Sequence, residues 1–227
     1  MHQGAVNGTA MIYAGRVGTG EPAGEGSTAK RVAVRAAVLE ATAALLEEAP
    51  YAELNIERIA TRAGISRTAF YFYFRDKREV LMRLAADVAE QLYGEADVWF
   101  SARGAPSEQL REALQRVASL YAEHGAVLRA VAEGATSDEQ IAAFWNGMLE
   151  RLIAATRARI EGEQREGRAV VADAAASAFA LGWMTERAFH QQFVQGRPVS
   201  TTSLVQALSE IWVRAIYGSG PQIGPAA

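Results

Sequence analysis

Two short helical segments that meet at Gly64 are the feature that most constrains the fold of this chain. Asn55 is a favourable N-cap for the first segment, and Gly64 is the residue type that most often ends a helix in a positive-φ conformation. Ser66 is the expected N-cap of the second segment, and the small Ala60 allows the two helices to approach closely. The apolar residues available to fill the space between them are Ile56, Ile59, Ile65 and Phe70. This spacing predicts a helix-turn-helix.

The polar residues of the second segment fall on its opposite face and are Arg67, Thr68, Tyr71 and Tyr73. A guanidinium group, hydroxyls and aromatic edges suit the bases and phosphates of a DNA major groove. The alternative is an ordinary helical hairpin with a solvated face. We interpret Phe70, Phe72 and Phe74 as core residues, because apolar rings on a short helix usually pack inside.

The rest of the chain has the period of helices, without strand-like alternation. We expect helices at 30–49, from Asp76 past Leu92, at 107–132, from Ser137 to Glu163, at 173–194 and at 200–217. Residues 1–27 contain seven glycines and no periodicity, so we expect a disordered tail there, and a second one at 219–227. The expected fold class is therefore all-α.

The charge of the chain is unevenly distributed. The net charge is −3, but residues 30–78 carry nine Lys or Arg against six acidic residues, which leaves −6 for the remainder. A mildly basic segment on an acidic body suits a small module that touches phosphate, joined to a body that does not.

The residue types of common catalytic and metal sites are scarce. The chain has no cysteine, which excludes disulfides, thiolate zinc sites and a cysteine nucleophile. Of its three histidines, His2 lies in the expected tail, and His124 and His190 belong to different helices without a triad or metal-site spacing. We therefore expect no enzyme activity, no cofactor and no metal. No apolar run reaches the length of a membrane span, so we expect a cytoplasmic protein without a membrane partner.

The stretch from Ala63 to Leu81, with its run Phe70-Tyr71-Phe72-Tyr73-Phe74, resembles the signature of the tetracycline-repressor (TetR) family. The resemblance implies three N-terminal helices that bind DNA, at 28–75, and a helical ligand-binding and dimerisation domain at 76–218. By position, it implies that Arg67, Thr68 and Tyr71 lie at base edges and adjoining phosphates. It also implies that Tyr73 lies near the DNA backbone and Lys77 at a phosphate, where the positive end of the fourth helix would point the same way. The complete predicted DNA-binding set is Asn55, Ser66, Arg67, Thr68, Tyr71, Tyr73 and Lys77.

The C-terminal part adds a narrower resemblance. The segments 183–187 and 211–218, together with Phe193, resemble the last two helices of those family members that hold elongated apolar ligands in a tunnel. The tunnel residues that this resemblance implies are Trp99, Phe100, Tyr121, Trp145, Leu149, Leu152, Trp183, Thr185, Phe189 and Trp212. Where those members place two asparagines, this chain has Gly182 and Thr185, so a ligand would find one hydroxyl and more space. The alternative for each aromatic residue is an ordinary core position.

The expected function is that of a ligand-responsive transcriptional repressor. A homodimer would bind palindromic operator DNA and be released by an apolar small molecule, so the expected partners are operator DNA, that effector and a second copy of the chain. The residues expected at the dimer face lie in the last two helices and are Phe179, Ala180, Leu181, Leu204, Leu208, Ile211 and Ile216. The alternative is a protein that sequesters hydrophobic ligands on the same scaffold without operator function.

Overall fold

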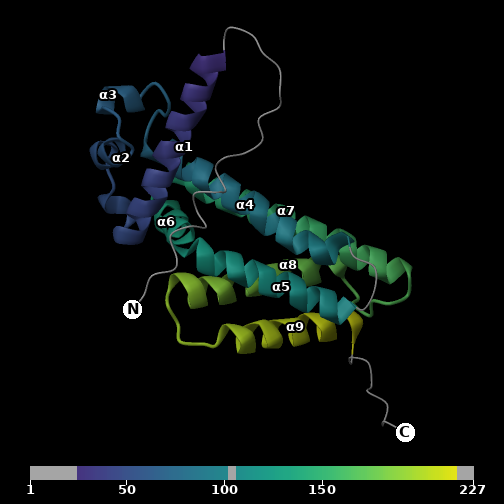
Figure 1. The fold of residues 1–227 in the computed structure, drawn as a ribbon. Helices are drawn as coiled ribbons and strands as arrows, with labels where there is room; N and C mark the ends of the chain where they lie inside the picture. The colour runs from purple at the N-terminus through teal and green to yellow at the C-terminus, as the bar shows by residue number, and fades with distance from the viewer. Residues whose placement is uncertain (1–24, 102–105, 219–227) are drawn as a thin grey trace.

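The computed structural model describes residues 25–101 and 106–218, and every regular element within these ranges is helical (Figure 1). The all-α prediction is therefore confirmed. The elements are α1 (Glu25–Glu48), η2 (Tyr51–Glu53), α2 (Ile56–Arg62), α3 (Arg67–Phe70), α4 (Lys77–Ser101), α5 (Pro106–Glu123), α6 (Gly125–Ala135), α7 (Glu139–Arg165), α8 (Ala174–Phe189), the π-helical turn η3 (His190–Val194) and α9 (Thr201–Tyr217). Within the described ranges, no helix combines the length and the apolar character that crossing a membrane requires.

Two boundaries differ from those expected. The first helix begins at Glu25, not Lys30, so the last three residues of the expected N-terminal tail are helical. The remainder of that tail, 1–24, and the expected tail at 219–227 lie outside the described residues. The single helix expected at 107–132 is two helices, because the chain turns at His124, where φ is −107° and ψ is 20°. That turn directs α6 toward α1, η2 and α4.

The predicted N-caps of the short helices are confirmed. The Asn55 side chain accepts a hydrogen bond from Arg58 N at 2.9 Å, and Ser66 Oγ accepts one from Ala69 N at 3.0 Å. Asp76 Oδ1 accepts one from Glu79 N at 2.8 Å at the start of α4. Each bond satisfies a backbone N–H that has no partner within the helix, which fixes where these helices begin.

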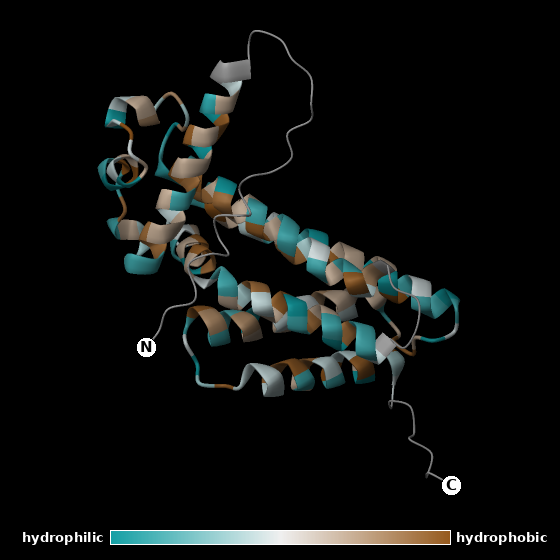
Figure 2. Ribbon diagram, in the orientation of Figure 1, coloured by the Kyte–Doolittle hydropathy of each residue, from teal (hydrophilic) through white to brown (hydrophobic). Residues whose placement is uncertain are grey.

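The helices form a small N-terminal head and a larger body, and α4 is common to both (Figure 1). We call α1, η2, α2 and α3 the head and α4 to α9 the body. In the head, Ile59 and Phe70 are completely buried, and α1 packs against α2 and α4. In the body, α4 packs on α5, α7 on α8, and α5 on α9. Helix α6 lies at the junction and is predominantly apolar (Figure 2), because it contacts the head and the body at once.

The last two helices bury part of the surface that was expected at a dimer interface. Leu181, Leu208 and Ile216 are 5%, 2% and 0% exposed, so they belong to the core of the subunit and the expectation for them was wrong. The physical reason is that α9 packs against α5 and α8, which takes up its strongest apolar stripe. Phe179 and Ile211 remain 59% and 46% exposed, Ala180 is also exposed, and Leu204 is half-buried.

Replacing glycine by alanine should change the free energy of unfolding in opposite directions at Gly64 and Gly94. Gly64 has a φ of +71°, a conformation that costs a residue with a side chain about 1–2 kcal/mol, so we expect Gly64→Ala to lower the free energy of unfolding by that amount. Gly94 lies in α4, and an added Cβ there meets nothing within 4 Å. Gly94→Ala should therefore raise the free energy of unfolding by about 1 kcal/mol, because alanine favours the helix. Urea denaturation of both variants measures these changes, and a stabilising Gly64→Ala would contradict the turn.

Candidate functional site

The face predicted to read DNA is exposed at the end of the head. Ser66, Arg67 and Thr68 are exposed at the start of α3, and Tyr71 is 50% exposed directly after it. No hydrogen bond or ion pair within the described residues involves Arg67, so its guanidinium has all of its donors available. The side-chain oxygens of Asn55 and Ser66 are engaged in capping, so these two residues position the helices.

Phe72 corrects the interpretation of the aromatic run. Phe70 and Phe74 are buried and their ring centroids lie 5.9 Å apart, as expected for core residues. Phe72 is 75% exposed, because a residue midway between two positions that point into the core must point away from it. Its ring therefore joins that of Tyr71 on the outer surface of the head, where it adds an apolar group able to contact a thymine methyl or a sugar.

Tyr73 and Lys77 are less available than expected. Tyr73 is half-buried, and its carbonyl accepts a hydrogen bond from Arg35 Nη1 at 2.6 Å. The Lys77 ammonium donates to the carbonyls of Tyr51 and Leu54, at 3.0 and 2.7 Å, and lies 4.5 Å from the Tyr51 ring centroid. The expectation of a Lys77 ammonium directed at phosphate was wrong for this conformation, because η2, which the sequence did not reveal, presents carbonyls to it. Burial also lowers the pKa of Lys77.

Most other basic groups around α2 and α4 are paired within the chain. Arg62 contacts Glu48 at 2.9 Å, and Arg75 contacts Glu79 at 3.1 Å. Arg78 contacts Asp138 at 3.1 Å, which joins the start of α4 to the N-cap of α7. The excess positive charge of the head is therefore concentrated at residues such as Arg67 that have no acidic neighbour.

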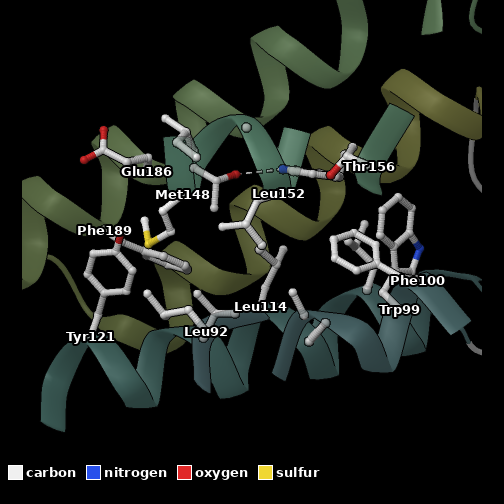
Figure 3. Close-up of a pocket in the computed structure, with 18 residues that line it drawn as sticks. Leu92, Trp99, Phe100, Leu114, Tyr121, Met148, Leu152, Thr156, Glu186 and Phe189 are labelled. Carbon is white, nitrogen blue, oxygen red and sulfur yellow. Dashed lines mark hydrogen bonds between the residues drawn. The ribbon is translucent and has the colours of Figure 1, made fainter. Parts of the chain in front are cut away.

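A cavity of about 100 Å³ lies in the body, lined by residues of α4, α5, α7, α8 and α9 (Figure 3). Its walls are almost entirely apolar. The residues that line it are Leu92, Ala96, Trp99, Phe100, Leu110, Ala113, Leu114, Val117, Tyr121, Met148, Leu149, Leu152, Thr156, Gly182, Thr185, Glu186, Phe189 and Trp212. A concave, mostly apolar space with a few polar groups is the usual form of a small-molecule site.

Most of the predicted tunnel residues lie in this lining, namely Trp99, Phe100, Tyr121, Leu149, Leu152, Thr185, Phe189 and Trp212. Trp145 and Trp183 lie outside it, so their place in an effector site stays a prediction. Trp145 lies one helical turn before the lining residues of α7 and is half-buried. Trp183 lies outside the face of α8 that lines the cavity. The centroid of its ring lies 6.3 Å from that of the exposed Phe179.

Apart from Gly182, the remaining lining residues were not identified from the sequence. Those of α4 and α5 recur three or four positions apart, so a stripe extended from Trp99 and from Tyr121 would have found them. They are Leu92, Ala96, Leu110, Ala113, Leu114 and Val117. Glu186 lies within the C-terminal motif, but no periodicity indicates that a charged residue faces an apolar cavity.

Thr185 and Gly182 differ from the expectation of a free hydroxyl beside open space. Thr185 Oγ1 accepts a hydrogen bond from Trp212 Nε1 at 2.9 Å, drawn as the dashed line in Figure 3. The Trp212 ring meets the Trp99 ring edge-on, with centroids 5.5 Å apart. Ile153 takes the space beside Gly182, since a Cβ added there would lie 2.7 Å from Ile153 Cγ1. The contacts of Trp212 with Thr185 and with Trp99 thus join α9 to α8 and to α4 at the cavity wall.

Two titratable groups lie at one end of the cavity. Burial raises the pKa of Glu186, with a smaller opposing effect of Arg187. Burial also raises the pKa of Tyr121 strongly, and the Glu186 charge adds to that shift. The phenol therefore keeps its proton at neutral pH and can donate a hydrogen bond.

Comparisons with known proteins agree with both parts of this arrangement. Residues 38–84 match the family "Bacterial regulatory proteins, tetR family", and residues 110–218 match "Transcriptional regulator EthR, C-terminal domain". The "HTH-type transcriptional regulator EthR" of Mycolicibacterium smegmatis is 33% identical over 82% of this chain and 87% of its own length. That of Mycobacterium tuberculosis H37Rv is 33% identical over 80% and 86%.

Solved structures share the fold at lower identity. SmeT, the repressor of the Stenotrophomonas maltophilia multidrug efflux pump SmeDEF, has a TM-score of 0.68 at 20% identity, over 82% of this chain and 91% of its own. A TetR-family regulator from Mesorhizobium loti has a TM-score of 0.65 at 20% identity, over 84% and 98%. The chain therefore belongs to the TetR family of bacterial regulatory proteins, as a transcriptional regulator of the helix-turn-helix type with a C-terminal domain of the EthR type.

Proposed function

We propose that this protein is a repressor whose homodimer binds a near-palindromic operator through two α3 helices and leaves it when a small molecule occupies the body cavity. The observation that carries the proposal is the position of α4. Leu81 and Leu84, near its start, are completely buried in the core next to the head, while Trp99 and Phe100, near its end, line the cavity. One helix therefore connects the candidate DNA-reading face to the candidate effector site. Such a protein acts in the cytoplasm, where the operator is.

The exposed groups of α3 support the DNA-binding part of the proposal. Arg67 has the length and geometry for a bidentate contact to guanine, and Thr68 and Tyr71 add hydroxyls beside it. The exposed ring of Phe72 extends the same surface. In a dimer, the two recognition helices would enter successive major grooves about 34–36 Å apart.

The dimer face is proposed on α8 and α9. Phe179 and Ile211 are large apolar side chains that remain exposed on these two helices. Exposed apolar groups on adjacent helices favour a four-helix contact with a second copy, which would bury both of them. Both helices also contribute to the cavity, so the same elements would join the subunits and sense the ligand.

The size of the cavity supports a switch. Small-molecule sites usually measure about 300–1,000 Å³, whereas this cavity measures about 100 Å³. An effector must therefore separate the helices that enclose the cavity, and α4 is one of them. A ligand that binds only after this separation favours the separated state and weakens operator binding.

The contribution of Arg67 can be measured on operators selected from a library of random duplexes. Arg67→Ala should weaken binding by about 1–3 kcal/mol and relax the preference at one base pair, because a bidentate contact is lost. Arg157→Ala, on the exposed surface of α7, is the matched control and should leave binding unchanged. If Arg67→Ala kept both affinity and base preference, the proposed orientation of α3 would be wrong.

The dimer face predicts a change in oligomeric state. Phe179→Glu should convert the dimer to a monomer at micromolar concentration, because it places a charge in a buried apolar contact. Val32→Glu, at a position of α1 that is 54% exposed, should leave the dimer intact. Sedimentation velocity distinguishes the two, and a dimeric Phe179→Glu variant would remove α8 from the interface.

A side chain that fills the cavity should uncouple ligand from DNA. Ala113 lines the cavity and is 5% exposed, so the ring of Ala113→Phe would occupy the space for an effector. We expect this variant to bind operator as the unmodified protein does and to lose release by any effector found in a screen. Ala122→Phe, on the exposed side of the same helix, should keep the response. Normal release of the Ala113→Phe variant from DNA would place the effector site elsewhere.

A further inference from the structure

Glu186 is the single charged residue in the lining of the described cavity. Its side chain is 5% exposed, and its Oε2 atom is buried without a hydrogen-bond partner among the described residues. A buried carboxylate oxygen without a donor is unfavourable, because the group has lost its water and gained nothing in exchange. A donor supplied by a ligand would remove this cost.

The neighbouring cations do not replace such a donor. Arg187 Nε lies 3.8 Å from Glu186 Oε2, beyond hydrogen-bond distance, and the Arg187 side chain is 60% exposed, so solvent screens it. His190 Nδ1 lies 3.9 Å from Oε1, and burial lowers the pKa of this histidine, so its ring is neutral at pH 7. The predominant effect at Glu186 is desolvation, which raises its pKa.

A second buried carboxylate shows how this fold satisfies such a charge elsewhere. Glu163 is 1% exposed, and its two oxygens contact Arg159 Nη2 at 2.8 Å and Arg168 Nε at 2.6 Å. Both contacts are ion pairs, and the one from Arg168 Nε is also a charge-assisted hydrogen bond. Glu163 thus has the partners expected of a structural residue, and the cavity carboxylate Glu186 does not.

Aromatic rings surround the same end of the cavity. The centroids of Tyr121 and Phe189 are 5.4 Å apart, and Phe193 lies 6.2 and 5.9 Å from these two rings. Tyr121, Phe189 and Glu186 lie together at one end of the drawn pocket, and Trp99 and Phe100 lie at the other (Figure 3). Aromatic faces next to a carboxylate are the combination that recognises ammonium groups.

We propose that the effector is an amphipathic amine, whose cationic head binds Glu186 beside Tyr121 and Phe189 and whose apolar body extends toward Trp99. This inference rests on the proposed function and deepens it by naming the chemical class of the effector. An ammonium group provides both a positive charge and hydrogen-bond donors for Oε2. A carboxylate-headed ligand would instead meet Glu186 with a like charge and no cationic lining residue.

Three ligands of equal chain length test the head group directly. Octylamine, octanol and octanoate are titrated into the full-length protein, and binding is followed by the fluorescence of Trp99 and Trp212, which line the cavity. We expect octylamine to bind about tenfold or more tightly than octanol, as a charge-assisted hydrogen bond implies, and octanoate to bind most weakly. In Glu186→Gln the preference for the amine should fall to about twofold or less. Glu150→Gln, on the exposed face of α7, is the matched control and should keep the full preference.

The outcomes separate this proposal from the function on which it rests. If the unmodified protein binds octylamine and octanol equally, the amine proposal is overturned while the cavity stays a ligand site. If Glu186→Gln keeps the preference, another group binds the amine and the proposal is equally overturned. If none of the three ligands binds, the cavity fails as an effector site, and the amine proposal fails with it. Because the first comparison uses the unmodified protein, it does not depend on the variant folding.

Discussion

Helix α4 is the constraint on which the arrangement of the protein depends. It is 25 residues long, which corresponds to about 37 Å. It packs against α1 of the head along one part and lines the cavity along another. Val80, Leu81 and Leu84 are completely buried where it meets the head. Trp99 and Phe100 lie about four turns further along, against the cavity. Because a continuous helix is stiff along its axis, a displacement at one end must be accommodated at the other.

The sequence was sufficient where local rules decide the structure and insufficient where long-range packing decides it. The caps at Asn55 and Ser66 depend on bonds three residues away, so the residue type alone predicted them. Phe72 and Lys77 were misplaced for two reasons. The exposure of Phe72 depends on which side of a turn faces the core. The environment of Lys77 is set by the backbone carbonyls of Tyr51 and Leu54, more than 20 residues away in the sequence. Trp145 and Trp183 lie outside the observed lining for a related reason: the presence of a bulky ring in a helix does not reveal which of two neighbouring faces lines the cavity.

The junction between head and body is polar as well as apolar. Glu133 Oε2, in α6, accepts a hydrogen bond from Tyr51 N, in η2, at 3.0 Å. Arg129 donates to the carbonyl of Leu46 at 3.1 Å, which adds the end of α1. These bonds are directional, so they tolerate small rotations poorly, whereas the apolar contacts of α6 tolerate them well. The head is thus held at a defined angle to α4 and α6.

The small volume of the cavity sets a requirement on any ligand that acts through this junction. An effector too large for the cavity cannot bind the conformation with the helices in contact. Its binding free energy must therefore offset the cost of separating contacts such as that between Trp99 and Trp212. In so small a space, burial of apolar surface contributes little binding free energy. A hydrogen bond to the unpaired Oε2 of Glu186 contributes further binding free energy, and this bond forms only when the cavity is occupied. By linkage, operator DNA must weaken the binding of that ligand by the same factor as the ligand weakens DNA binding. A polar group that is costly in the empty state therefore makes the two states differ in affinity, which is what a switch of this kind requires.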